Sequence, residues 1–575
     1  MALEKPSGTG FKDSDPSRPG IPPSGSAASW YTPGDARRGR CLRGPSREGA
    51  QIRMSTVALI NPPGIKTFSS IQMQTPNPPI GTAYVAGTLK HAGVACTCID
   101  AVGEGMDTIT AYDRRTDMKM QGLTVAQIIE RIPADSDIIG ITCLFSTLWP
   151  ISRDMAEEIR KAFPKALLVL GSEHGTAVPE YSLRSSVFDM IALGEGVETM
   201  LDIVELWRKH GANREEWAKV RGIAYLDSAD RAAARFVSTG LAARKRDVDD
   251  IPLPDWDSIP IEEYISRHQI NGANIGRSMP LVATWGCPYQ CTFCSSPGMW
   301  TQRWIARNPK LVVDEMELYK NKYNVTNFDF QDLTAMIRRS WIMDFTQELI
   351  DRDLGVTWQL PSGTRAEVFD REVARRLYAA GLRLLSFAPE SGSDRMLKLI
   401  KKQVDLKKMI GAMREAIDAG LKLSSFIVIG FPGETKESLA ETMALVRRMA
   451  WMGVHDVAVT KFVPYPGSQL FKDLQEQGKL GLDDDFFIMP MDFYTSKAPS
   501  FVEGMSSRYM YWTMMWMFLN FYAISMTRRP WRFFQAIWSV AHGVENTRFA
   551  KWLNDVFVVR RKWNRRFRQL TASQG

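Results

Sequence analysis

The sequence predicts an α/β fold with two parallel-strand domains followed by a helical C-terminal region. Three observations support this prediction. Short apolar segments alternate with helical segments twice, between residues 57 and 193 and again between residues 281 and 462, as expected for parallel sheets covered by helices. Residues 509–526 form an uncharged run rich in aromatic residues and methionine, which we expect to belong to the helical region.

The 575 residues suit several domains, because single domains usually span about 100 to 200 residues. The first residues are rich in Gly, Pro, Ser and Arg and lack apolar periodicity, so we expect them to be disordered or to precede a true start at Met54. They also lack the apolar stretch of a signal peptide. The expected parts are a leader (1–53), a doubly wound domain (54–245), a linker (246–275), a barrel (276–480) and a basic helical region (481–575).

The first domain is expected to be a Rossmann-like, doubly wound open sheet with its ligand crevice at the carboxyl ends of the strands. An NAD-binding domain is disfavoured, because no GxGxxG follows the first strand. Prolines in Asp249–Trp256 predict an extended linker after this domain. The predicted strands are Val57–Ile60, Val94–Ile99, Ile138–Thr142, Leu167–Leu170 and Met190–Leu193, and the predicted helices between them are Thr82–His91 and Ile151–Phe163.

Three cysteines with CxxxCxxC spacing, Cys287, Cys291 and Cys294, form the most informative motif. Thiolates are soft ligands, and three of them on one loop suit an iron–sulfur cube whose fourth iron stays open for chemistry. A structural zinc site would need a fourth Cys or His nearby, and three clustered thiols cannot all pair as disulfides. The four other cysteines are scattered, and we expect them to pack as small apolar groups.

The second domain is expected to begin with an apolar strand-like run, Leu281–Thr284, directly before the cysteines. Its later strands each end in polar or glycine residues. Loops at the carboxyl ends of parallel barrel strands converge on one mouth and carry the active site. The predicted strands are Asn327–Asp332, Thr357–Leu360, Leu384–Ala388, Ser425–Ile429 and Val457–Phe462.

The cysteine motif and these strand ends resemble the radical S-adenosylmethionine (SAM) enzymes. The resemblance implies a partial (β/α)6 barrel and a four-iron four-sulfur cluster held by Cys287, Cys291 and Cys294. SAM would bind the open iron and be cleaved there to a 5′-deoxyadenosyl radical. Phe293, just before the last cysteine, matches the aromatic residue that packs against the adenine in this family.

Further SAM contacts are implied by the segments Glu390-Ser391-Gly392 and Gly430-Phe431-Pro432-Gly433-Glu434, at Glu390, Ser391, Val428 and Gly430. Gln331-Asp332 stands where family sequences often carry Asp-Asp, and Ala388-Pro389 where they carry Gly-x. By residue type alone, Glu390 could instead be a carboxylate at a helix start, and Arg365 an ordinary salt-bridge partner.

The first domain resembles cobalamin-binding domains through Asn61-Pro62-Pro63-Gly64, Pro78-Pro79-Ile80-Gly81 and two glycine-containing turns after the fourth and fifth strands. Ser172 stands where the family usually has Gly. No Asp-x-His-x-x-Gly is present, so His174 is not expected to ligate cobalt, and Asp100 would bind a ribose or cap a helix. The implied cobalamin contacts are Asn61, Pro62, Pro63, Gly171, Ser172, His174, Thr176, Gly194, Glu195 and Gly196.

Together the two resemblances identify a cobalamin-dependent radical SAM enzyme of the methyltransferase type, related to the anaerobic magnesium-protoporphyrin ester cyclase group. They imply methylation of a poorly activated carbon of a small-molecule substrate, with flavodoxin or ferredoxin as electron donor. The aromatic, Met-rich run near the C-terminus favours a hydrophobic substrate. Oxidative cyclisation or rearrangement is the alternative within the same architecture. A cobalamin-binding sensor with a non-catalytic cluster is the alternative of another class. No catalytic acid or base is assigned.

The C-terminal region is strongly basic. From Arg528 onward it carries eleven Lys or Arg and two acidic residues, whereas the net charge of the whole chain is +8. For this region we favour a soluble helical cap over the barrel mouth. Peripheral membrane contact ranks second, and a membrane span ranks third. A nucleic-acid partner is not expected, because no RNA-binding module accompanies the basic residues. An oxygen-labile cluster implies the reducing cytoplasm, with the inner face of the membrane as an alternative location.

Overall fold

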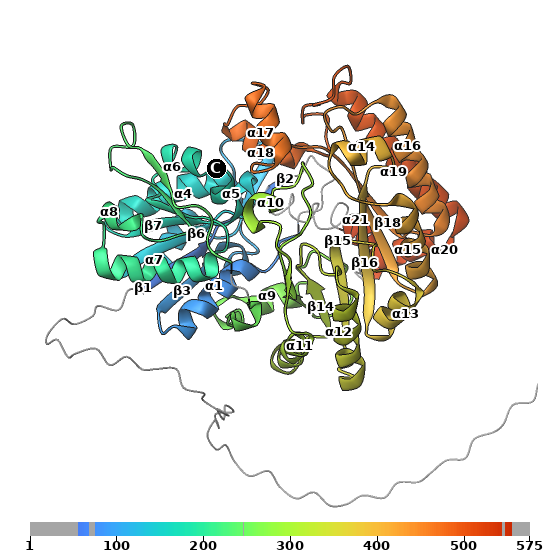
Figure 1. Ribbon diagram of the computed structural model, residues 1–575, viewed down its shortest axis with the longest axis horizontal. Helices are drawn as coiled ribbons and strands as arrows, with labels where there is room; N and C mark the ends of the chain where they lie inside the picture. The colour runs from blue at the N-terminus through green and yellow to red at the C-terminus, as the bar shows by residue number, and fades with distance from the viewer. Residues whose placement is uncertain (1–55, 68–74, 245–246, 543–546, 555–575) are drawn as a thin grey trace, which may run out of the picture. The chain divides into compact units, whose positions relative to one another are not determined.

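Two largely parallel sheets organise the part of the chain that the computed structural model describes, which comprises residues 56–67, 75–244, 247–542 and 547–554 (Figure 1). The expected leader lies outside these described residues, so its disorder stays a prediction. The expected domain limits at 245, 275 and 480 stay proposals as well.

The first sheet is a seven-stranded sheet in the N-terminal part of the chain. Its five strands from β8 to β3 run parallel, and β9 and β10 extend it antiparallel at one edge. In spatial order the strands are β10 (Phe236–Ser238), β9 (Ile223–Leu226), β8 (Met190–Ala192), β7 (Leu167–Gly171), β6 (Ser136–Thr142), β1 (Thr56–Asn61) and β3 (Ala95–Asp100).

Helices cover both faces of this sheet, because alternate side chains of each strand point to opposite sides. Val57 and Leu59 of β1 pack with α1 and α7, whereas Ala58 and Ile60 pack with α3, α4 and α6. The predicted doubly wound sheet is therefore confirmed. The helices of this part are α1 (Ile80–His91), α2 (Ala101–Glu104), α3 (Val125–Arg131), α4 (Trp149–Ala162), α5 (Ser172–Ala177), α6 (Pro179–Arg184), α7 (Gly196–His210) and α8 (Arg214–Trp217).

A small antiparallel sheet, which the sequence analysis did not predict, lies beside the first one. Its strands are β2 (Gly64–Thr67), β5 (Met118–Gln121) and β4 (Ile109–Ala111).

The second sheet has six strands, all parallel, and confirms the predicted partial barrel. Its edge strands are the first and the last along the chain, so the barrel stays open between them. In spatial order the strands are β11 (Ser278–Leu281), β14 (Asn327–Phe330), β15 (Thr357–Thr364), β16 (Leu382–Glu390), β17 (Lys422–Ile429) and β18 (Asp456–Lys461).

The first barrel strand begins earlier than predicted. The expected strand Leu281–Thr284 is wrong, because β11 ends at Leu281 and Thr284 belongs to a separate two-residue strand. Pro280 obscured the pattern, since proline cannot donate to a sheet ladder. An edge strand tolerates it, and β11 is an edge. The remaining elements are the hairpin strands β12 (Thr284–Trp285) and β13 (Ile305–Ala306) and the helices α10 (Ser296–Trp300), α11 (Pro309–Tyr323), α12 (Arg339–Arg352), α13 (Arg371–Ala379), α14 (Asp394–Leu399), α15 (Leu406–Asp418) and α16 (Lys436–Met452).

The barrel interior is polar, whereas its outer face is apolar. Phe328 and Phe330 of β14 face the helices, and Asp329 between them is fully buried on the other side. Gln359 of β15 lies on the same inner side and bonds the Ala273 backbone, accepting from its N–H at 2.9 Å and donating to its carbonyl at 3.0 Å. The chain before β11 therefore runs against the inner face of the barrel.

The segment between the two sheets is packed against both parts. It contains helix α9 (Ile261–Ser266), which the sequence analysis did not predict. Tyr264 of α9 donates to Asp100 at 2.8 Å, and the Asp255 N–H donates to Ala83 of α1 at 2.8 Å. Trp256 and Tyr264 are buried in the same hydrophobic cluster as the barrel helices.

The C-terminal region is helical, as predicted, but α19 does not cap the barrel mouth. Met510, Met514 and Phe521 of α19 pack against α16 and β18, at the edge of the sheet. None of the described helices combines the length and the hydrophobicity that a membrane span requires. The helices of this region are α17 (Gln469–Glu476), α18 (Asp484–Ile488), α19 (Ser507–Arg528), α20 (Trp531–His542) and α21 (Arg548–Asn554).

Helix α21 bridges the open side of the barrel. The Phe549 N–H donates to Asp456, the first residue of β18, at 3.3 Å. Lys551 donates to the Gly272 carbonyl, just before β11, at 3.2 Å. Both edges of the barrel are therefore tied through the end of the described chain.

Candidate cofactor site

The three motif cysteines lie on one loop, residues 286–304, which we call the cysteine loop. It leaves the barrel after β11 and is framed by the β12–β13 hairpin. The Cys294 N–H donates to the Cys291 carbonyl at 3.2 Å, and the Thr334 hydroxyl, just beyond β14, donates to Cys287 Sγ at 3.3 Å. All three thiols are free and partly buried.

The donor set suits a cluster. Burial raises the pKa of Cys291 to about 11 and also raises that of Cys294, while the nearby Lys402 ammonium opposes the shift at Cys291. Bound iron would displace these protons. Within the described ranges, no three His, Cys, Asp or Glu side chains are grouped to hold a single ion. By residue type and spacing, three soft thiols on one loop suit a cluster bound through three irons.

Asp332, at the end of β14, fixes the start of the cysteine loop. Its carboxylate accepts from the Thr284 hydroxyl at 2.6 Å and from the Ala283 N–H at 3.2 Å. Burial raises its pKa to about 6. Asp332 keeps the second aspartate of the usual family pattern, whereas Gln331 departs from the first, and in the structure Asp332 positions the backbone that enters the loop.

Glu390 and Lys402 form a buried ion pair beside the cysteines. Glu390 Oε1 lies 2.9 Å from Lys402 Nζ, and the Lys402 ammonium lies 5.9 Å from the centre of the Phe293 ring. Glu390 has a φ of 66°, a backbone conformation that costs free energy for a residue with a side chain. Sequence reasoning missed Lys402, because nothing local marks a loop lysine as the partner of this carboxylate.

The other predicted SAM contacts divide into two groups. Val428 lies in the same apolar cluster as Phe293, near Gly430, which has a φ of 89°. The Gly430 N–H donates at 2.9 Å to Glu434, a buried carboxylate whose pKa burial raises. Ser391 instead turns toward α16, with its hydroxyl 3.1 Å from that of Thr442. Ser391 therefore shapes the turn, and its contact with SAM stays a prediction.

Arg365 is stacked on the cysteine loop. Its guanidinium lies 3.8 Å from the centre of the Tyr289 ring, between the first two cysteines, and it also pairs with Glu367 at 2.6 Å. The sequence analysis considered Arg365 as an ordinary salt-bridge partner. In the structure it braces the loop that holds the thiols.

Asn61, predicted to contact cobalamin, is bonded within the protein. Its side-chain amide donates to Asp100 at 2.7 Å, and Tyr264 donates to the other oxygen of the same carboxylate. Burial raises the pKa of Asp100. Pro62 and Pro63 are buried just beyond β1. Asp100 thus locks the ends of β1 and β3 to α9 and does not resemble a free ribose ligand.

The turn after β7 has an unusual backbone. Ser172 has a φ of 80°, which explains why the family usually has Gly there. It directly follows Gly171, the last residue of β7. Thr176 donates its hydroxyl to the Ser172 carbonyl at 3.1 Å and accepts from the Gly194 N–H at 3.0 Å. One side chain therefore joins the two glycine-containing turns.

Glu195 links the second of these turns to the cysteine loop. Its carboxylate accepts from Arg244 at 2.7 Å, and the two side chains are only 11% and 7% exposed. Arg244 also donates to the carbonyl of Trp300, at the end of α10, at 2.7 Å. Gly196, the next predicted contact, begins α7.

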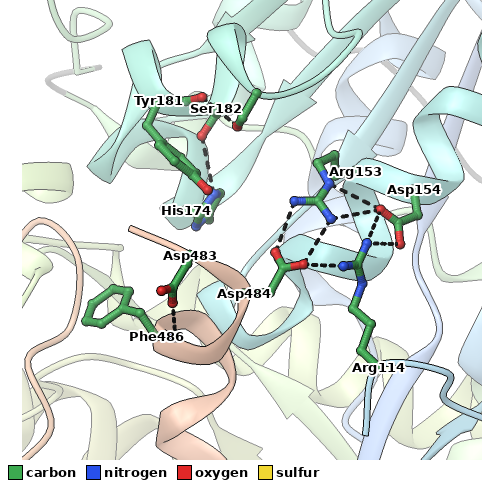
Figure 2. A network of polar contacts seen from close by, with 10 residues as sticks. Arg114, Arg153, Asp154, His174, Tyr181, Ser182, Asp483, Asp484 and Phe486 are labelled. Carbon is green, nitrogen blue, oxygen red and sulfur yellow. Dashed lines mark hydrogen bonds and ion pairs between the residues drawn. The ribbon is translucent and has the colours of Figure 1, made fainter. Parts of the chain in front are cut away.

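His174 is a structural residue. Its ring is fully buried, stacks on Trp149 with centroids 4.6 Å apart, and has both nitrogens bonded, one to Ser146 at 2.9 Å and the other to Ser182 at 3.2 Å. Figure 2 shows the bond to Ser182. Burial lowers the pKa of His174 to about 3. Both ring nitrogens are therefore used within the protein, and a contact of His174 with cobalamin stays a prediction.

Helix α18 crosses from the C-terminal region to the first domain. Asp484 bonds Arg153 of α4 at 3.0 Å and also pairs with Arg114, and Arg153 and Arg114 share Asp154 (Figure 2). The Phe487 ring meets that of His174 edge-on, with centroids 5.1 Å apart. The C-terminal region is thus held to the first domain by charged and aromatic contacts.

The turn after β7 and the cysteine loop touch through Glu173 and Ser295. The Ser295 hydroxyl, one residue after Cys294, donates to the Glu173 carboxylate, whose pKa burial raises. A second close approach lies nearby: Gly467 has a φ of 85°, and a Cβ there would lie 3.0 Å from that of Ala177. The sequence analysis did not assign Glu173 a role.

Exposed apolar side chains follow the ends of strands in both domains. Leu144 and Phe145 follow β6, Leu333 follows β14, and Tyr465 follows β18. Large apolar groups left uncovered at converging strand ends are typical of ligand sites. Together with the left-handed turn at Ser172, they fit a large flat macrocycle, and the thiols with the Glu390–Lys402 pair fit a cluster with SAM.

Comparisons with known proteins define the class. Residues 281–446 match the radical SAM superfamily, and residues 71–204 match the B12 binding domain. The chain is therefore a cobalamin-dependent radical SAM enzyme, and its cofactors are a four-iron four-sulfur cluster, SAM and cobalamin. The predicted family and cofactors are confirmed.

Two curated relatives narrow the type. The chain is 30% identical to the anaerobic magnesium-protoporphyrin IX monomethyl ester cyclase of Cereibacter sphaeroides over 70% of this chain and 63% of that protein. It is 26% identical to the cytidylyl-2-hydroxyethylphosphonate methyltransferase of Streptomyces wedmorensis over 79% of this chain and 88% of that protein. The enzyme is accordingly of the methyltransferase or the cyclase type.

The fold also matches a solved structure. The radical SAM methyltransferase TsrM from Kitasatospora setae, solved with tryptophan and a SAM analogue, aligns with a TM-score of 0.56 and 16% identity, covering 73% of this chain and 76% of that chain. At this level of identity the likeness shows the shared fold.

Proposed function

We propose that the enzyme methylates a poorly activated carbon of a small, hydrophobic molecule. The observation that carries the proposal is the contact between Glu173 and Ser295, because it joins the turn of the B12-binding domain to the cysteine loop. When bound, SAM at the cluster supplies a hydrogen-abstracting radical and cobalamin supplies the methyl group. Such a reaction needs both cofactor sites to open on one shared space.

The residues of the barrel have separate tasks in this proposal. Cys287, Cys291 and Cys294 hold the cluster. Glu390 and Lys402 complement the amino and carboxylate groups of SAM in charge. Phe293, Val428 and Gly430 line its adenine, and Arg365 keeps the cysteine loop in place through Tyr289.

The turns of the first domain would receive cobalamin. Backbone at Ser172 and Gly194, both with positive φ, lets the chain approach a flat ring closely. Leu144 and Phe145 offer apolar contact, which also keeps water from the reacting groups. The remaining proposed contacts are Pro62, Pro63, Gly171, Thr176, Glu195 and Gly196.

The relatives support methylation over cyclisation. The match to the methyltransferase spans 88% of that protein, whereas the match to the cyclase spans 63% and leaves more than a third of it unmatched. The higher identity to the cyclase, 30%, keeps oxidative cyclisation or rearrangement as the second candidate. A reduced flavodoxin or ferredoxin would supply the electron, in the cytoplasm or at the inner face of the membrane.

Product analysis tests the proposal. The anaerobically reconstituted enzyme is given a reductant, SAM with a labelled methyl group, and a small-molecule extract of the source cells. Methylation yields 5′-deoxyadenosine and S-adenosylhomocysteine together, with label in one extract component. Deoxyadenosine without S-adenosylhomocysteine favours cyclisation. A confirmed cluster with no SAM cleavage favours a sensor and contradicts both.

A further inference from the structure

Helix α19 is apolar around its whole circumference. Between Arg508 and Arg528 it carries no charged side chain, and it presents tryptophan, tyrosine, phenylalanine and methionine on every side. A helix of this kind is normally buried all round, since water would otherwise cover a large apolar surface. Something must therefore cover each face of α19.

The protein covers one face only. Met510, Met514 and Met517 are buried against α16 and β18. Trp512 and Trp516, one helical turn apart on the other side, are 60% and 54% exposed. Such long aromatic side chains are rarely left in water, so this side lacks a partner within the described chain.

Helix α20 and the end of α16 extend the exposed surface. Arg528 of α19 lies 4.1 Å from the centre of the Trp451 ring, which joins α16 to α19. In Figure 1 these helices form the outer layer of the barrel beside β18. We call this surface the aromatic face. Its exposed apolar members are Trp451, Tyr509, Trp512, Trp516, Leu519, Trp531, Phe533, Phe534, Ile537 and Trp538.

Charge on this surface has one sign. From Arg508 to His542 the chain has four arginines and no Asp or Glu. Arg529 and Arg532 turn inward and bond carbonyls at the end of α16, at 2.9 Å to Met452 and 2.8 Å to Gly453. Arg508 and Arg528 are exposed at opposite ends of α19. The aromatic face is therefore flanked by cations.

These features select among possible partners. A second copy of the chain would place the aromatic face against itself, because a twofold interface uses the same patch on both subunits, and would bring like charges together. An anionic bilayer would accommodate both the exposed aromatic side chains and the arginines that flank them. Tryptophan and tyrosine prefer the lipid–water interface, and arginine is attracted to anionic headgroups.

We propose that the aromatic face docks peripherally on an anionic lipid bilayer, with its rings among the headgroups and Arg508 and Arg528 on lipid phosphates. The inference does not depend on methyl transfer. Met510, on the buried side of α19, approaches Gly430, where a Cβ would lie 3.3 Å from the Met510 side chain. A docked α19 would thus touch the strand end that lines the SAM site.

Vesicle co-sedimentation of the full-length holoenzyme tests the proposal. Vesicles of phosphatidylcholine with phosphatidylglycerol should bind the protein, and vesicles of phosphatidylcholine alone should bind it far less. A Trp512→Gln/Trp516→Gln variant should lose most of the binding. An Arg508→Gln/Arg528→Gln variant should bind anionic vesicles at low salt about twenty-five-fold more weakly, at about fivefold for each arginine.

A matched control changes exposed apolar residues elsewhere. The Leu311→Gln/Leu318→Gln variant alters α11 and should bind vesicles like the wild type. SAM cleavage without substrate should be equal in all variants, which shows that they are folded. Equal sedimentation of the wild type and the Trp512→Gln/Trp516→Gln variant would overturn the proposal. A second result would also overturn it: light scattering shows a wild-type dimer that the Trp512→Gln/Trp516→Gln variant converts to monomer, and the wild type does not bind vesicles.

Discussion

Replacing His174 by glutamine tests whether this residue is a buried structural histidine. Burial lowers its pKa from 6.5 to about 3. Because the folded state resists protonation, His174 favours folding fully above about pH 6.5, and this contribution is lost as the pH falls toward 3. At about pH 5 the loss is about 2 kcal/mol, since each pKa unit corresponds to about 1.4 kcal/mol.

The effect is measurable by calorimetry of the apoprotein. A loss of about 2 kcal/mol lowers the unfolding midpoint of a domain of this size by about 4–8 °C between pH 8 and pH 5. His174→Gln should remove this part of the pH dependence, while His455, whose pKa burial also lowers to about 3, keeps its own part. His91→Gln, an exposed position on α1, is the control and should change nothing.

Two results would refute this reasoning. If His174→Gln kept the full pH dependence of the wild type, another group would titrate there. If the variant bound cobalamin but its cob(II)alamin spectrum lost a nitrogen coupling in electron paramagnetic resonance, His174 would be a cobalt ligand, contrary to its bonds with Ser146 and Ser182.

Three further predictions concern the cofactor site. Lys402→Met should lower the free energy of unfolding by about 3–5 kcal/mol, because it leaves the Glu390 carboxylate buried without its partner. The double variant Lys402→Met/Glu390→Gln should recover most of the lost thermal-unfolding midpoint but not the affinity for SAM. If the stability losses of the two single variants simply added in the double variant, the pairing would be contradicted. Glu173→Ala should slow S-adenosylhomocysteine formation about tenfold, through one lost hydrogen bond, with cofactor content unchanged; loss of the cofactors instead would make Glu173 purely structural. Asp484→Asn should lower the free energy of unfolding by at most about 1 kcal/mol, because its ion pairs are partly exposed, and should speed proteolysis near α18. Unchanged cleavage would show that Asp484 does not hold α18 in place.

Much of the fold was predictable because it depends on neighbouring residues. The alternation of buried side chains along β1, β6 and β7 is visible in the sequence, as is the run of strands and helices in the barrel. The start of β11 was misjudged, since Pro280 hides a strand that only its place at a sheet edge permits. The sequence analysis also misplaced α19, because the apolar surface of this helix does not indicate which face meets the barrel.

The sequence alone predicted the cluster ligands and identified both cofactor-binding domains, because a three-cysteine spacing and the repeating strand pattern are local properties of the chain. The tertiary structure decided which polar groups remain available. His174 and Asn61 are occupied by internal hydrogen bonds, and Lys402 reaches Glu390. Glu173 meets Ser295 across 122 residues of chain. Such contacts depend on how whole elements pack, and no short segment of the sequence records that packing.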